Sequence, residues 1–497
     1  MAMPRMIGST KTIENRSKKY LQGALYKVLF KEGGTEASVS KQLKDFLKSS
    51  KRVYKWETWD TVRKLRDRKL FAPALKLAET MSRRGMNEID SNLAIRLYLV
   101  AKARGILAAE EYFISLPDSS KNHLTYGTLL NCYCQKLMIE EAESLFEKMK
   151  ELQLVTTNLP YNSLMTMYTK TGKPERIPEM IQEMKANNVQ PNSYTYNVWM
   201  RALAAVNDIA GVERVVDEIN RDNEGVDWTT YSNIASIFVD SGLLEKAEWA
   251  LKELEKKNNF RDILPFQHLI TLYGRLGNLK ELYRIWRSLR LAFTKTANVS
   301  YLNMIHALVS LNDLPGAEKC FKEWEVGRST YDIRIANVLL GAYAKQGSME
   351  KVEEFQLRVR QNGGKPNAKT WEILMNLHLE NKNLDKAVEC VKNAVSIGRG
   401  NGDKWVPSPE TIDSLMANFE QENNVDGAVD LIDTLRKAQN NINPKLYESL
   451  IRTYAKAGKQ NTLLRPRLKM ENIELSEECS KLLQSVSPDD LRKSWSA

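Results

Sequence analysis

The residues that could do chemistry in this chain are few, and the clearest set is His378 and Glu380 in an H-x-E spacing. In zinc deaminases this spacing serves a metal-activated water, but a downstream C-x-x-C must supply two thiolate ligands. Only Cys390 and Cys479 follow here, far outside that spacing. The remaining histidines, which have no partner spacing for a metal or a catalytic triad, are His123, His268 and His306. A G-x-x-x-x-G-K-S/T phosphate loop is also missing. We therefore expect no enzyme, no metal and no cofactor.

Composition predicts a soluble protein with a large buried core. Apolar residues make up 42% of the 497 residues and charged residues 27%, which is ordinary for a globular chain. No run of about 18 apolar residues is present, so we expect no transmembrane helix. The five cysteines are odd in number and lack the spacing of a disulfide framework, so free, buried thiols in a reducing compartment are expected. These are Cys132, Cys134, Cys320, Cys390 and Cys479.

A repeat of 35 residues organises the sequence. Aromatic or aliphatic residues recur in a first series at Tyr126, Tyr161, Tyr196, Tyr231, Phe266, Tyr301, Ile335, Trp371, Ile412 and Tyr447. A second series follows sixteen residues later at Ala142, Ile177, Val212, Ala247, Leu282, Ala317, Val352 and Ala387. Two series in constant phase indicate two helices per repeat, because residues at i, i+3, i+4 and i+7 around each series are apolar. Such a hairpin cannot bury its apolar faces alone and must stack on its neighbours, so the sequence predicts an all-α solenoid.

Glycines and prolines punctuate the repeats. Glycines at the end of several first helices predict left-handed caps: Gly172, Gly242, Gly277, Gly347 and Gly458. Pro191 and Pro366 end second helices. A longer interval before Ile412 contains Gly398, Gly400, Gly402, Pro407 and Pro409, which predict a loop insertion. Less regular repeats are expected over Trp56–Met81 and Leu93–Leu116, with Ala74 and Ala109 in the second series. We expect a basic N-terminal region (1–55), the solenoid (56–458) and a C-terminal cap and tail (459–497).

The positive charge is concentrated at the N-terminus. Residues 1–72 carry 18 Lys and Arg against 7 Asp and Glu, whereas residues 73–497 carry 55 of each. Residues 1–31 are basic, rich in Ser and Thr, and have a single acidic residue, which favours an organellar targeting segment. The alternative is a basic arm that stays on the protein and contacts phosphates. For that reading the candidate RNA-binding residues are Lys18, Lys19, Lys51 and Arg52.

Three segments resemble the pentatricopeptide repeat family: LTYGTLLNCYCQKLMIEEAESLFEKMKELQL, LPYNSLMTMYTKTG and SYTYNVWM. The resemblance covers residues 56–458, and the uninterrupted units are similar to the P-type subclass. It implies a right-handed superhelix of about 12 helical-hairpin repeats that binds organellar RNA. KKYLQGALYKVLFKEGGTE, YKWETWD and YGRLGNLKELYRIWRSLR are similar to plant mitochondrial members of the family, some of which are ribosomal.

The same resemblance implies that each repeat can read one base through two polar side chains. One is the residue directly after the first-series residue of the repeat. The other is the residue four positions before the first-series residue of the following repeat. The competent pairs are Asn162 with Asn192, Asn197 with Asp227, and Ser232 with Asp262. Other pairs depart from the pattern: Gly127 with Thr157, Gln267 with Ala297, Leu302 with Tyr331, Ala336 with Asn367, Glu372 with Ser408, and Asp413 with Asn443. The polar pairs could equally be solvated residues at repeat junctions.

Three functions fit these observations. The first is a structural component of the plant mitochondrial ribosome, in the small subunit, that contacts ribosomal RNA and ribosomal proteins. The second is a factor that binds one organellar transcript for its stability, splicing or translation. The third is a protein-binding scaffold without RNA. No small-molecule substrate and no membrane partner are expected, and a plastid is the alternative to the mitochondrion.

Overall fold

The computed structural model describes residues 25–48, 55–84, 89–222, 226–258, 261–327, 330–400, 405–438, 443–471 and 473–488. Every regular element in these ranges is helical, so the predicted all-α class is confirmed. The chain forms two compact units, residues 1–243 (unit 1) and residues 244–497 (unit 2). None of the helices in the described ranges combines the length and the apolarity that crossing a bilayer requires.

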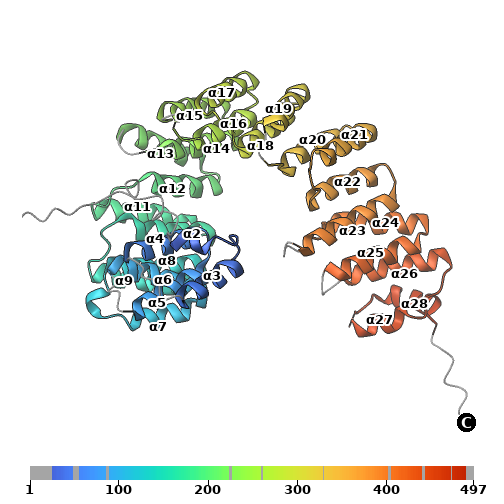
Figure 1. The fold of residues 1–497 in the computed structure, drawn as a ribbon, viewed down its shortest axis with the longest axis horizontal. Coiled ribbons are helices and arrows are strands. Elements are labelled where there is room, and N and C mark those ends of the chain that lie inside the picture. The colour runs from blue at the N-terminus through green and yellow to red at the C-terminus, as the bar shows by residue number, and fades with distance from the viewer. Residues whose placement is uncertain are drawn as a thin grey trace, which may run out of the picture. The chain divides into compact units, whose positions relative to one another are not determined.

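Unit 1 is a stack of helical hairpins (Figure 1). Its α-helices are α2 (Leu25–Leu29), α3 (Glu36–Lys48), α4 (Lys55–Asp67), α5 (Phe71–Arg83), α6 (Asp90–Arg104), α7 (Ile106–Ile114), α8 (His123–Lys136), α9 (Ile139–Glu151), α10 (Asn158–Lys170), α11 (Ile177–Ala186), α12 (Ser193–Ala205), α13 (Ile209–Asp222) and α14 (Trp228–Asp240). The first helices α6, α8, α10, α12 and α14 each contact the next. Because α2 packs on α4 and α3 on α5, helical packing extends N-terminally of residue 56 into the predicted basic region.

Unit 2 continues the same pattern of hairpins within its own residues. Its helices are α15 (Leu244–Lys257), α16 (Leu264–Leu276), α17 (Leu279–Ala292), α18 (Asn298–Ser310), α19 (Leu314–Gly327), α20 (Ile333–Lys345), α21 (Met349–Gln361), α22 (Ala368–Glu380), α23 (Leu384–Gly400), α24 (Pro409–Glu422), α25 (Val425–Ala438), α26 (Pro444–Ala457), α27 (Leu464–Met470) and α28 (Glu477–Val486). First helices again contact in sequence, from α16 to α18, α20 and α22. The hairpins agree with about twelve repeats.

The second series and most of the first series form the core, as predicted, whereas Trp371 and Ile412 of the first series are only partly buried. Residues of the second series from Ala142 to Ala387 are at most 1% exposed, and Tyr161 and Tyr447 of the first series are fully buried. Aromatic rings of the first series also contact the preceding second helix edge-on, as Phe146 and Tyr161 do with centroids 5.3 Å apart. All five cysteines are free and buried, and burial raises the pKa of the Cys132 thiol to about 11.

The glycine caps are confirmed, but the predicted loop insertion is partly wrong. Gly172, Gly242, Gly277, Gly347 and Gly458 have φ between 64° and 84°, the left-handed region in which glycine pays no steric cost. Gly398 and Gly400, however, belong to α23, which runs for 17 residues. A longer second helix therefore takes up part of the extra length. The connection ends where Pro409 begins α24 and the Ser408 hydroxyl accepts the Thr411 amide.

A recurring tyrosine joins first helices to the preceding second helix. The hydroxyl of Tyr168 on α10 donates to Glu143 on α9 at 2.7 Å, and that of Tyr343 on α20 donates to Glu318 on α19 at 2.8 Å. Burial, and secondly the bond to Glu143, raise the pKa of Tyr168 to about 12. The tyrosines therefore remain neutral donors, and each bond fixes one hairpin against the next.

Two glycines in first helices of unit 2 allow a direct test of how tightly these helices pack. A Cβ added to Gly274 on α16 would lie 2.6 Å from the Cβ of Ala307 on α18, whereas one added to Gly341 on α20 meets its nearest atom at 3.9 Å. We expect Gly274→Ala to lower the free energy of unfolding by about 1 to 2 kcal/mol through overpacking. Gly341→Ala should raise it by about 0.5 to 1 kcal/mol, since alanine favours helix. Urea unfolding of both variants checks this, and equal stability of the two would show that α16 and α18 are not in close contact.

Candidate nucleic-acid interface

A polar hollow of about 630 Å³ lies along the first helices of unit 1. We call it the unit 1 hollow; its lining includes Lys102 of α6, Asn131 and Gln135 of α8, Asn158, Asn162, Ser163, Thr166 and Lys170 of α10, and Asn192 and Tyr194 of α12. Its lining includes no acidic side chain. Because one helix per repeat contributes to it, equivalent side chains recur along its length.

The predicted pair Asn162 and Asn192 comes together in this hollow. The Asn192 Oδ1 atom caps α12 by accepting the Thr195 amide at 2.9 Å, and the Asn162 amide donates to the same oxygen at 3.5 Å. Asn162 is buried and its Oδ1 has no partner in the described part of the chain, whereas Asn192 lines the hollow. The pair thus serves the helix cap and also presents amide groups toward the hollow.

The pair Asn197 and Asp227 is joined through a third residue. The Asn197 amide donates to the Thr229 hydroxyl at 3.4 Å, which in turn donates to Asp227 Oδ1 at 2.5 Å. Asp227 also caps α14, where it accepts the Thr229 amide. The Asn197 Oδ1 atom has no partner among the described residues. As with Asn162, this amide oxygen is buried at the repeat junction.

The third predicted pair falls in two different units. Ser232 is a buried residue of α14 in unit 1. Asp262 precedes α16 of unit 2, where its carboxylate accepts the Leu264 amide at 3.0 Å. The structure thus gives the position of each residue within its own unit. That the two residues read one base together remains a prediction. Lys18, Lys19, Lys51 and Arg52 lie outside the described residues.

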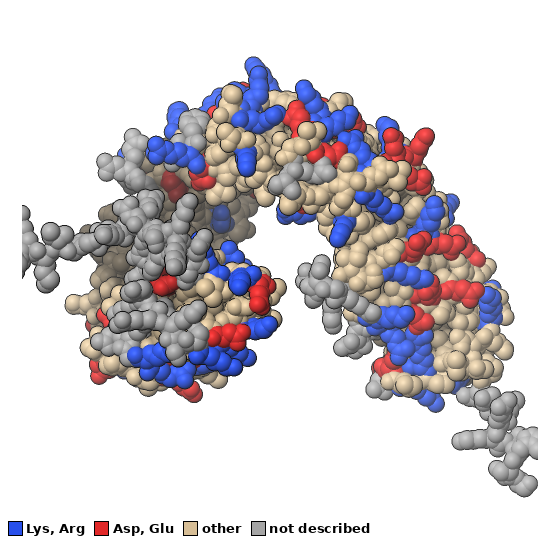
Figure 2. All heavy atoms as spheres, viewed as in Figure 1, with Lys and Arg blue, Asp and Glu red and all other residues tan. Residues whose placement is uncertain are grey.

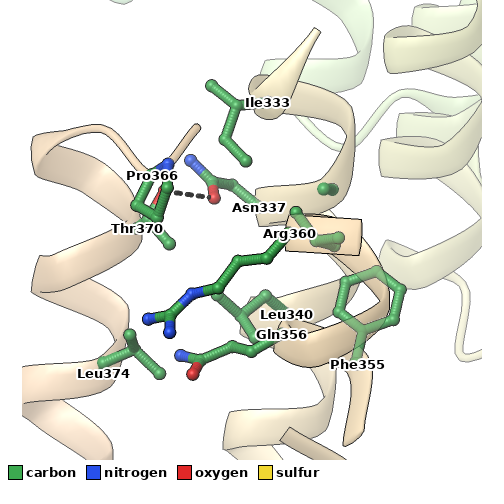
Figure 3. Close-up of a pocket in the computed structure, with 11 residues that line it drawn as sticks. Ile333, Asn337, Leu340, Phe355, Gln356, Arg360, Pro366, Thr370 and Leu374 are labelled. Atoms are coloured by element: carbon green, nitrogen blue, oxygen red, sulfur yellow. Dashed lines mark hydrogen bonds between the residues drawn. The ribbon is translucent and has the colours of Figure 1, made fainter. Parts of the chain in front are cut away.

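A pair that the sequence reading missed lies in unit 2. Asn337 on α20 donates to Asn367 Oδ1 at 3.0 Å, and Asn367 caps α22 through the Thr370 amide, as Asn192 caps α12. Figure 3 shows the Thr370 hydroxyl joined to Asn337, at 2.8 Å. The partner of Asn367 in this repeat is therefore Asn337 rather than Ala336, because Asn337 is the fifth residue of α20 as Asn162 is of α10. The sequence feature that indicates this pair is the spacing of 30 residues between its two asparagines, which is also the spacing between Asn162 and Asn192.

Exposed apolar side chains mark the first turn of successive first helices. In unit 1 they are Leu124 of α8, Leu159 of α10 and Tyr194 of α12, with exposures of 38%, 57% and 53%. Leu264 and Val299 hold the same position in unit 2. The Tyr194 hydroxyl lies 3.2 Å from that of Thr166, so its ring is held at the hollow. Exposed apolar groups at regular spacing can pack on the faces of unstacked bases.

Lysines lie in the last turn of three consecutive first helices of unit 1. Lys102 on α6, Lys136 on α8 and Lys170 on α10 recur every 34 residues, and all three are exposed. None of them forms an ion pair within the described ranges; Lys102 Nζ lies 5.6 Å from the centroid of the Tyr98 ring. A row of unpaired cations suits the phosphates of a single strand. The exposed apolar groups lie at the opposite ends of the same helices.

Equivalent positions in unit 2 are different. A hollow of about 960 Å³ follows α18, α20 and α22. On α20, Val338 and Gly341 occupy the positions that Ser163 and Thr166 occupy on α10. The final residues of α18, α20 and α22 are Ser310, Lys345 and Glu380. Arg334 and Lys369 at the first turns are paired with Asp332 and Glu372. This second hollow therefore offers phosphates less positive charge than the unit 1 hollow does. Figure 2 shows both signs of charge interspersed over the face in view.

His378 does not take part in a metal site in the described part of the chain, where no group of three potential ligands occurs. It lies on α22, and burial lowers its pKa.

Comparison with known proteins gives consistent matches. Models described as PPR repeat match residues 124–154, 229–259 and 299–326, the PPR repeat family model matches 160–205, and the pentatricopeptide repeat domain model matches 329–381. The large ribosomal subunit protein mL101 (rPPR4) of Arabidopsis thaliana is 58% identical, over 98% of this chain and 100% of that protein.

Two further matches have lower identity. A pentatricopeptide repeat-containing protein of Arabidopsis thaliana, named as mitochondrial, is 36% identical over 94% of this chain and 87% of its own. The crystal structure of the pentatricopeptide repeat protein PPR10 from maize matches 92% of this chain and 74% of that chain, with 16% identity and a TM-score of 0.39. The name of mL101 refers to the large subunit, so the expectation of a small-subunit protein is not supported.

The lysine row predicts a salt-dependent loss of single-strand binding. Replacing Lys102, Lys136 and Lys170 with alanine should lower the slope of log affinity against log salt by about 2, at about 0.7 per phosphate of a single strand. Titrating an unstructured RNA at several salt concentrations measures this slope. A charge-matched control replaces the exposed Lys76, Lys148 and Arg221 on second helices. An equal decrease of the salt slope in this control would show that the lysine row is not a specific phosphate-binding site.

The Asn197 and Asp227 pair predicts a local change of sequence preference. Asn197→Ser with Asp227→Asn alters the hydrogen-bonding groups but retains a capping residue at the start of α14. Selection from a randomised single-stranded RNA pool should show an altered preference at one nucleotide position. Gln182→Ser with Asp217→Asn, on second helices, is the matched control. An unchanged profile in the Asn197 variant would identify the pair as surface residues of the repeat junction.

Proposed function

Because the chain belongs to the pentatricopeptide repeat family, we propose that it is an RNA-binding component of the large subunit of the mitochondrial ribosome. The observation that carries this proposal is its 58% identity to the large ribosomal subunit protein mL101, which spans 98% of this chain and all of that protein. Further relatives at 36% and 38% identity are named as mitochondrial. Ribosomal RNA and neighbouring ribosomal proteins are the proposed partners, and the names give the plastid no support.

The charge distribution supports a scaffold rather than a strong general RNA binder. Residues 73–497 carry as many acidic as basic side chains, so counterion release along the whole solenoid cannot supply the affinity. Binding must instead depend on shape and on a few placed cations, such as the lysine row of unit 1. A ribosome provides a folded RNA surface on which such a protein can dock by shape.

The poor continuity of the polar pairs supports the same choice. Leu302 lacks a hydrogen-bonding side chain, and the carboxylates of Glu372 and Asp413 repel phosphate at their positions. A protein that selects one transcript needs enough consecutive readable bases to distinguish it. The few competent pairs are too short a run for that task.

A transcript-specific factor is the second candidate. It is favoured by two consecutive repeats that carry a competent pair, Asn162 with Asn192 and Asn197 with Asp227, the first of which lines the unit 1 hollow. Such a factor would associate with one message rather than with a ribosomal subunit.

Sedimentation separates the two candidates. Mitochondria are lysed in detergent, the ribosomes are dissociated into subunits by removing Mg²⁺, and the gradient fractions are probed for this chain after light nuclease trimming of messages. The chain should co-migrate with the large subunit at moderate salt. Migration with the small subunit, or release into light fractions after trimming, would contradict the proposal. A large-subunit protein and a small-subunit protein probed in the same fractions serve as controls.

A further inference from the structure

We propose that the two N-terminal hairpins of unit 1, α2 with α3 and α4 with α5, carry a second RNA-binding surface, which holds the phosphates of a double-stranded RNA. The surface consists of Lys27 and Lys31, on and just after α2, with Lys64 of α4 and Arg68 just after it. The proposed function names RNA as its partner; the surface itself is argued from the contacts of α2 with α4. It is distinct from the unit 1 hollow, which is formed by α6 to α12.

Aromatic rings hold two of the four cations in place. Tyr26 on α2 and Phe30 just after it have ring centroids 4.6 Å apart. Lys64 Nζ is 5.1 Å from the centroid of Tyr26, and the Arg68 guanidinium is 5.5 Å from Tyr26 and 4.6 Å from Phe30. Cation contacts with ring faces restrict long side chains that would otherwise move freely. The two charges are therefore pre-positioned on one side of α4.

A buried carboxylate fixes α2 on α4. Glu57 of α4 is only 9% exposed, and its Oε1 atom accepts the backbone amide of Leu25 at 2.7 Å. Leu25 and Leu29 of α2 are buried. Because an acidic group favours the positive N-terminal end of a helix, this bond anchors the short helix at its start. The rings and lysines of α2 are thereby held in a fixed register against α4.

Positive charge remains in excess on this surface after ion pairing. Lys64 is bound by Asp60 at 2.8 Å, while Glu32 and Asp67 are engaged by Lys41 and Arg66. Lys27, Lys31 and Arg68 are exposed and form no ion pair within the described ranges. The neighbouring Arg63 and Lys69, also exposed, add to the excess. Anionic partners are therefore favoured.

The rings themselves indicate a duplex rather than a single strand. Single-stranded RNA is bound by stacking its bases on open aromatic faces, but Lys64 and Arg68 occupy faces of Tyr26 and Phe30. A double-stranded RNA keeps its bases stacked inside the helix and is recognised by its backbone and shape. Four fixed or exposed cations on two neighbouring first helices match phosphates and have no need of base contacts.

The test compares two RNA ligands and two sets of substitutions in the full chain. The ligands are a blunt 16-base-pair RNA duplex and an unstructured 16-nucleotide single strand. Lys27, Lys31, Lys64 and Arg68 are all replaced with Gln, and the opposing set is Lys102, Lys136 and Lys170 replaced with Ala. We expect the fourfold variant to lose about tenfold or more in duplex affinity, with a salt slope lower by about 3 to 4. Its single-strand affinity should stay within about twofold, and the threefold variant should show the reverse.

A further variant keeps the charges but removes their support. Tyr26→Leu with Phe30→Leu should weaken duplex binding by about threefold, because Lys64 and Arg68 lose their ring contacts. Circular dichroism verifies that each variant is folded. Equal losses on duplex and single strand, or an unchanged duplex slope in the fourfold variant, would overturn the proposal. Because these measurements need no ribosome, their failure is distinguishable from failure of sedimentation with the large subunit.

Discussion

A hairpin of two short amphipathic helices cannot bury both apolar faces by itself, and this constraint governs the rest of the molecule. Each first helix must lie against the next, at distances as short as the contact between Gly274 and Ala307. Small or slender residues such as Ala142 and Val212 occur where second helices are buried. Once the spacing between repeats is set by packing, every exposed position of a first helix also recurs at that spacing. The functional side chains are thus ordered by the same contacts that stabilise the core.

The two units use this regular arrangement for different surfaces. In unit 1, polar side chains, the exposed Leu159 and Tyr194, and two unpaired lysines, Lys102 and Lys170, line one hollow. In unit 2 the corresponding hollow contains more apolar lining, such as Val338 and Ile373, and its Lys345 is accompanied by Glu380. Repeats that are neutral overall from residue 73 onward, with one cationic hollow and with further basic residues on the N-terminal helices α2 and α4, suit a protein that is docked at defined points. They do not suit a protein that coats a long strand.

The fold could be predicted from the sequence because the packing of each repeat requires apolar or small residues at fixed intervals along the chain. The buried series, the left-handed glycines and the early hairpins with Ala74 and Ala109 all follow from residue types at fixed intervals. The site was less predictable. Ala336 holds a position filled by tyrosine elsewhere, so the apolar Ile335 was chosen and the pair of Asn337 with Asn367 was missed. The exposure of Leu159 and Tyr194 and the ring contacts of Arg68 depend on tertiary packing. Gly398 and Gly400 are helical although their residue type indicated a loop.

The central claim is that this chain is a fixed part of the large ribosomal subunit and contacts its RNA directly. Ultraviolet crosslinking in intact mitochondria, followed by recovery of the chain and sequencing of the attached RNA, tests it most directly. We expect crosslinks concentrated at a few positions of the large-subunit ribosomal RNA, in near-stoichiometric amounts. Crosslinks concentrated on one messenger RNA, or the absence of crosslinked RNA, would contradict the account.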